Sequence, residues 1–146
     1  MPAPTDPRSQ IDHHERVLLL QRLWQTVKAQ AKTLERESST RVDSFVGVRE
    51  WDDSPEIFVR LGRSVGGHTH VIAMTITPAL DLNRLVFRVH AVHIADGETT
   101  VLPFERFDVR YDRAADRFRI DGQADASDDM VAFFVDRAKA LLFRQR

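Results

Sequence analysis

Three histidines in the middle of the chain have the types and spacing that could support chemistry. His68 and His70 are separated by one residue, and His93 lies in the next apolar stretch. In a strand, residues two apart project to the same face, so one strand can present two imidazoles together. A hairpin that sets His93 opposite His68 would bring three imidazoles to one end of an apolar face. Three such ligands can hold a zinc ion, so these histidines are candidate ligand- or metal-binding residues.

Whether the three imidazoles meet depends on the register of that hairpin. Apolar and polar residues alternate on both sides of a predicted turn at 78–83. Pairing Thr77 with Arg84 keeps both apolar sets on one face and sets His68 opposite His93. Because a slip by one residue would turn one apolar set toward water, the pattern favours this register.

The first strand of this hairpin resembles the opening half of a cupin motif, in which a glycine precedes a His-x-His pair. Gly62 stands before His68 and His70 in this way. A cupin has a glutamate four or five residues after the second histidine, whereas Met74 and Thr75 stand there in this chain. The second cupin motif is also missing from the sequence, so no cupin fold or activity is inferred.

Composition excludes several kinds of function. The chain has 146 residues, of which 42% are hydrophobic and 29% charged, as is typical of one soluble globular domain. A formal net charge of −1 provides no overall field for nucleic acid or anionic membranes, so neither is an expected partner. Without cysteine there is no disulfide, thiolate catalysis or Cys-ligated zinc, and no motif implies a cofactor. The N-terminus lacks the pattern of a secretory signal, which predicts a cytoplasmic protein.

Helical periodicity predicts a long helix near the N-terminus. From Ser9 to about Glu37 there is no glycine or proline, and apolar residues recur at spacings of three and four. Leu19 and Leu23 widen the apolar stripe, which makes them candidate interface residues for self-association as a homodimer. The alternative is that the whole stripe packs on a sheet. Residues 1–9 hold three prolines and predict a flexible tail.

A period of two replaces the helical period between residues 41 and 122, which predicts strands. The candidate strands are Val42–Arg49, Glu56–Leu61, His70–Thr77, Arg84–Ile94, Thr100–Tyr111 and Arg117–Asp121. Their connections are too short for the crossover helix that parallel strands need, so we expect an antiparallel meander with one apolar and one largely charged face. Pro103 cannot donate to a strand ladder and predicts an edge or a bulge near the start of its strand.

A second helix is predicted at the C-terminus, where Ser127 is a good N-cap and apolar residues line one face. The expected fold is therefore α+β, with a long N-terminal helix, a six-stranded antiparallel meander and a C-terminal helix in two layers. We expect residues 10–146 to form this single domain.

The sequence favours a non-catalytic binding or adaptor protein that acts through protein–protein contacts, without naming the partner. The polar sheet face, an exposed strand edge or the first helix could supply the surface. The alternative is a small-ligand or metal-binding domain, either enzymatic or not, with the histidines at one end of the sheet. Strict alternation puts Glu105 on the apolar face, although a bulge at Pro103 could turn it toward solvent.

Overall fold

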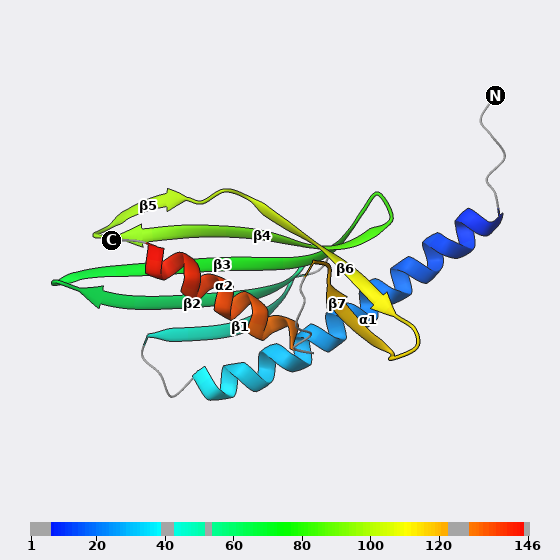
Figure 1. Cartoon of the computed structure of the whole chain (residues 1–146), viewed down its shortest axis with the longest axis horizontal. Coiled ribbons are helices and arrows are strands. Elements are labelled where there is room, and N and C mark those ends of the chain that lie inside the picture. Colours follow the sequence, from blue (N-terminus) through cyan, green and yellow to red (C-terminus); the bar gives the residue numbers. More distant parts are fainter. Residues whose placement is uncertain (1–6, 39–42, 52–53, 123–128, 145–146) are drawn as a thin grey trace, which may run out of the picture.

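A computed structural model describes residues 7–38, 43–51, 54–122 and 129–144, so residues 1–6 of the predicted tail lie outside the described part. Within these ranges, one helix, seven antiparallel strands and a second helix follow one another (Figure 1). This order confirms the predicted α+β fold. No helix in the described ranges is long and apolar enough to cross a membrane.

The elements are numbered in chain order. The helices are α1 (Pro7–Ser38) and α2 (Met130–Arg144). The strands are β1 (Ser44–Trp51), β2 (Ser54–Val65), β3 (His68–Asp81), β4 (Arg84–Ala95), β5 (Glu98–Val101), β6 (Glu105–Asp112) and β7 (Arg117–Ile120). They lie in the order β1-β2-β3-β4-β6-β7, with β5 beside the far end of β4. Apart from β5 and β6, which both pair with β4, consecutive strands are neighbours because each connection is short, which gives the predicted meander.

The turn between β3 and β4 is tighter than predicted, and this changes the register. It consists of Leu82 and Asn83, whose φ angles of 50° and 65° are those of a type I′ turn. Thr77 therefore pairs with Arg88 and not with Arg84, so the predicted register is wrong by four residues. Since four is an even number, the same side chains still face the core.

The predicted fifth strand is interrupted at Pro103, where, of the predicted edge or bulge, the structure has a bulge. Val92 pairs with Val101 and Val89 pairs with Glu105, so between these pairs β4 has two residues where its neighbour has three. The extra residue ends regular pairing and divides the predicted strand into β5 and β6. For this reason the sheet has seven strands where six were expected.

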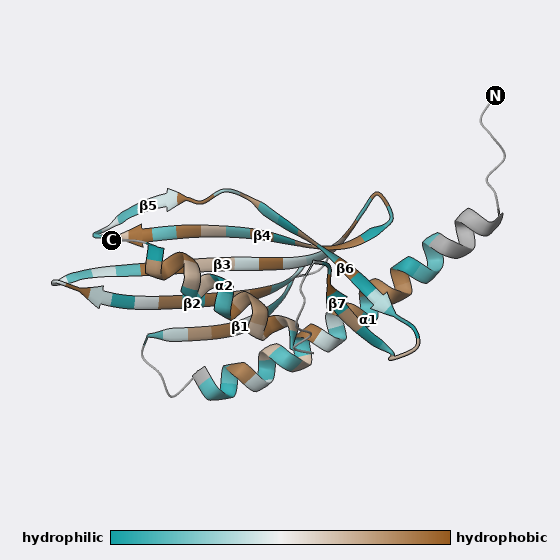
Figure 2. Cartoon of the chain, in the orientation of Figure 1, coloured by the Kyte–Doolittle hydropathy of each residue, from teal (hydrophilic) through white to brown (hydrophobic). Residues whose placement is uncertain are grey.

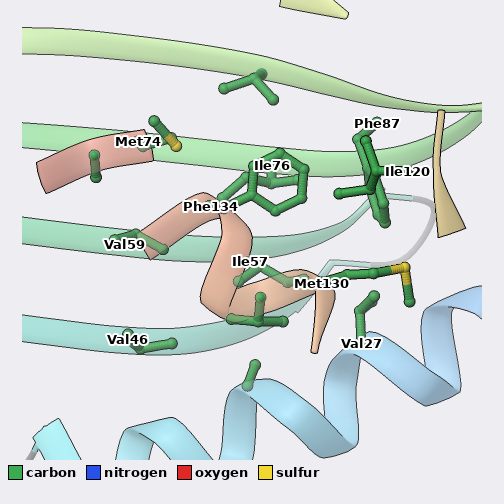
Figure 3. Packing of buried hydrophobic residues seen from close by; sticks show 14 of the residues in the cluster. Val27, Val46, Ile57, Val59, Met74, Ile76, Phe87, Ile120, Met130 and Phe134 are labelled. Atoms are coloured by element: carbon green, nitrogen blue, oxygen red, sulfur yellow. The ribbon is translucent and has the colours of Figure 1, made fainter. Parts of the chain in front are cut away.

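The core lies between the two helices and one face of the sheet (Figure 3). α2 packs across β2 and β3, while α1 runs beside β1 (Figure 1). Phe87 of β4 and Phe134 of α2 are completely buried and meet edge to face, with ring centroids 5.1 Å apart. Hydrophobic and hydrophilic residues alternate along the central strands (Figure 2), as expected for a sheet with one buried face.

The first turn of α2 is capped from two directions. The Oδ1 atom of Asp129 accepts a hydrogen bond from the amide of Ala132 at 3.0 Å, as an N-cap residue does. The Oε1 atom of Gln30 in α1 accepts another from the amide of Met130 at 2.9 Å. These bonds satisfy amides that have no partner within the helix and tie α1 to α2. Ser127, the predicted N-cap, lies outside the described residues.

Candidate binding site

The structure brings two of the three candidate imidazoles together. The buried side chain of His70, 8% exposed, stacks on His93 with ring centroids 5.2 Å apart and planes inclined by 5°. Nδ1 of His70 lies 3.0 Å from Nε2 of His93, so one ring donates a hydrogen bond and the other accepts it. The two residues are diagonal neighbours on β3 and β4, because His93 pairs with Ile72.

His68 lies apart from this pair. The predicted pairing of His68 with His93 is wrong because the two-residue turn displaces the register of β4. The Nδ1 atom of His68 instead lies 2.9 Å from Oδ2 of Asp96, and both side chains are exposed. Among the described residues, no group of three or more histidine or acidic side chains is placed to hold a metal ion. A ligand or metal function for the histidines stays a prediction.

The two candidate interface leucines point toward the chain's own core. Leu23 is completely buried, and Leu19 is partly buried against the same apolar cluster. The neighbouring Leu18 is a large apolar side chain of this stretch that does face outward, with 46% of it exposed. A contact between copies through Leu23 would require α1 to leave the sheet, and self-association through these residues stays a prediction.

Glu105 faces the helices, because the bulge at Pro103 leaves its side chain on the inner face. It accepts two hydrogen bonds from Arg137 of α2, one of them from Nε to Oε2 at 2.6 Å. These bonds raise the pKa of the Arg137 guanidinium, so this residue stays charged. A permanent cation neutralises the carboxylate, so the pair links β6 to α2 and does not present a free base.

Aromatic side chains cross the face of the sheet that lies opposite the core. Strand registers align Gly47, Phe58, Thr75 and His90 in one row from β1 to β4 on this face. The ring of Phe45 lies over Gly47, where an added Cβ would come within 2.7 Å of the ring atoms. Glycine at this position therefore leaves room for the Phe45 ring, which any side chain there would displace.

Phe104, in the bulge after β5, extends this row. Its ring centroid lies 4.9 Å from that of His90. Phe45 and Phe104, at the two ends, are 51% and 52% exposed. We refer to Phe45, Phe58, His90 and Phe104 as the aromatic band. Rings that remain half exposed in the folded chain can still bury apolar surface against a binding partner.

Four exposed arginines surround the aromatic band, on the rows directly beside it: Arg49, Arg60, Arg88 and Arg106. The guanidinium of Arg49 lies over the ring of Phe58, 4.0 Å from its centroid. Arg106 forms an ion pair with Asp81. Arg60 and Arg88 have no carboxylate partner within the described part of the chain. The surface around the band is therefore basic, although the whole chain is nearly neutral.

Sequence patterning did not reveal this band, because alternation predicts a largely charged outer face. One signal was present in β2, where Phe58 stands between Ile57 and Val59. A strand with one buried face is expected to carry a polar residue at such a position. The rings come from four segments, and the strand registers decide which of them lie side by side. Alternation in the sequence does not specify those registers.

No protein-family model matches this chain, and comparisons with curated proteins and with solved structures also give no match.

Proposed function

We propose that this chain is a non-catalytic binding protein that takes a protein partner on the aromatic band. One observation carries the proposal: the core lies on one face of the sheet, and the opposite face exposes aromatic rings among arginines. Aromatic residues and arginine are the types enriched in protein interfaces, where they supply much of the binding free energy.

Charge complementarity defines the chemistry of the partner. Arg60 and Arg88 offer guanidinium groups without a carboxylate among the described residues, and each can bind a carboxylate in a bidentate manner. The rings between them require apolar contact. The partner therefore presents acidic residues on either side of leucine-like or aromatic side chains.

The dimensions of the sheet suit a short segment. The row from Gly47 to His90 crosses three strand spacings, about 14 Å at the usual separation of strands. A segment of about four extended residues spans this distance. An acidic and apolar loop or tail of a protein has the required size.

A protein partner fits the charges better than a nucleic acid does. Single-stranded nucleic acid also stacks on aromatic side chains in basic grooves. However, Glu56 and Asp81 lie on the same face as the arginines, and the chain has a net charge of −1. These charges oppose a continuous phosphate backbone, whereas a protein segment can place its carboxylates at individual arginines.

A displayed peptide library tests the proposal against a matched variant. The wild-type chain and a double variant, Phe104→Ser with Arg88→Glu, are used in parallel selections, with Arg119→Glu as a control on an exposed part of β7. We expect the wild type and the control to enrich peptides that combine Asp or Glu with Leu or Phe. The double variant should lose this enrichment while keeping the wild-type circular dichroism spectrum.

Two outcomes would overturn the proposal. One is that no peptide class is enriched by the wild type beyond the level of the folded double variant. The other is that the peptides do not bind, whereas oligo-dT binds the wild type in a fluorescence anisotropy assay and binds the double variant more weakly. That second result would assign the aromatic band to single-stranded nucleic acid.

A further inference from the structure

A cavity of about 570 Å³ lies where β6 separates from β4, and it shares no residue with the aromatic band. Pairing between these strands reaches Val86 and Asp108, beyond which β6 pairs with β7 alone. Glu15, Arg16 and Leu19, in the N-terminal half of α1, form the remaining wall. This volume is within the range of small-ligand sites in proteins.

Four arginines and three carboxylates line the cavity, and four of these groups already neutralise one another. Arg113 of the β6–β7 turn bonds to Glu15 of α1. Arg110 of β6 lies 3.2 Å from Oδ1 of Asp121. Each ion pair joins two segments of the wall and so stabilises the shape of the cavity. Because the charges within each pair neutralise each other, these four groups leave little net charge for a ligand.

The other three charged groups have no such partners. Arg16 of α1 and Arg84 of β4 lack a carboxylate partner among the described residues. Asp108 is the third group, and its Oδ1 atom is buried with no hydrogen-bond donor in that same part of the chain. Buried carboxylate oxygens normally accept hydrogen bonds, since losing water without a replacement is unfavourable. The cavity therefore offers two guanidinium cations and one carboxylate, that of Asp108, which has no cationic partner among the described residues.

We infer that this cavity binds a small zwitterion that carries two anionic groups and one ammonium group, as an acidic amino acid does. The two anionic groups bind Arg16 and Arg84, whose planar guanidinium groups suit carboxylates. The ammonium group donates to Asp108. A simple dianion would leave the Asp108 carboxylate without a cationic partner, and a simple cation would be repelled by the arginines.

The wall formed by α1 is held in place before any ligand binds. Nη2 of Arg22 lies 2.6 Å from Oδ1 of Asp116, and Nη1 donates to the hydroxyl of Tyr111 at 3.2 Å. The Nδ1 atom of His13 lies 3.0 Å from Oδ1 of Asn83 in the β3–β4 turn. These contacts hold the wall on both sides of the cavity. Ligand binding therefore costs less conformational entropy, because the site is already ordered.

Isothermal titration of the full chain with L-glutamate and with glutarate tests the inference, because glutarate lacks only the ammonium group. We expect glutamate to bind at least about tenfold more tightly than glutarate, as one charge-assisted hydrogen bond implies. Arg84→Gln should weaken glutamate binding by about tenfold or more. Asp108→Asn should remove the preference for glutamate over glutarate, and Arg119→Gln, which does not line the cavity, should change neither affinity.

Three results would overturn the inference. The first is no saturable heat from either compound in the wild type. The second is equal affinity for glutamate and glutarate, which would leave Asp108 without the proposed role. The third is unchanged glutamate affinity in a folded Arg84→Gln or Arg16→Gln chain, with folding checked by amide NMR spectra.

Discussion

Replacement of Leu23 by alanine distinguishes a core role for the buried face of α1 from an interface role. Leu23 is completely buried, as are Val27 and Ala31 on the same helix, so every atom of its side chain is removed from water on folding. Truncation of a buried leucine typically costs about 3 kcal/mol, which includes the cavity that is left behind. For a chain of this size each kcal/mol lowers the melting temperature by roughly 2–4 °C. We therefore expect Leu23→Ala to lower the melting temperature by roughly 6–12 °C.

Leu18→Ala is the matched control, because Leu18 is 46% exposed and lies five residues before Leu23 in the same helix. Its stability should change by less than about 0.5 kcal/mol. Urea denaturation followed by tryptophan fluorescence gives the free energy of unfolding, and light scattering after gel filtration gives the mass. A Leu23→Ala chain that unfolds at the wild-type urea concentration while its mass halves would refute the core assignment and support an interface.

Three further predictions concern single contacts. Gln30→Ala removes a cap of α2 and should cost about 1 kcal/mol, with faster amide exchange at Met130; unchanged protection there would show that this cap is dispensable. Leu82→Asn should stabilise the chain by about 0.5–1 kcal/mol in urea, since asparagine tolerates positive φ; destabilisation would argue against a type I′ turn. Hydrogen bonds from Tyr111 and Arg22 lower the pKa of Asp116, so this contact stabilises the fold above the unfolded pKa and is lost as the pH falls through the lowered value. Asp116→Asn should therefore reduce stability at neutral pH but not at a pH below the lowered pKa, where Asp116 is protonated in both the folded and the unfolded chain, and an equal loss at both would contradict this linkage.

Periodicity along the chain determined which segments are helices and strands and which side chains face the core. Spacings of three and four predicted α1, and alternation placed Ile72 and Phe87 on the buried face. Proline chemistry predicted an edge or a bulge at Pro103, although not the division of the strand into two. These features are local, because backbone geometry, turn chemistry and the absence of a proline donor act within a few residues.

Tertiary structure alone decided which residues of neighbouring strands meet. Alternation specifies a face but allows any even shift, so it could not distinguish a pairing of Thr77 with Arg84 from the observed pairing with Arg88. The two-residue turn made that choice and separated His68 from His93. The aromatic band and the cavity beside Asp108 arise in the same way, because each combines segments whose relative positions depend on turns, a bulge and the docking of α1.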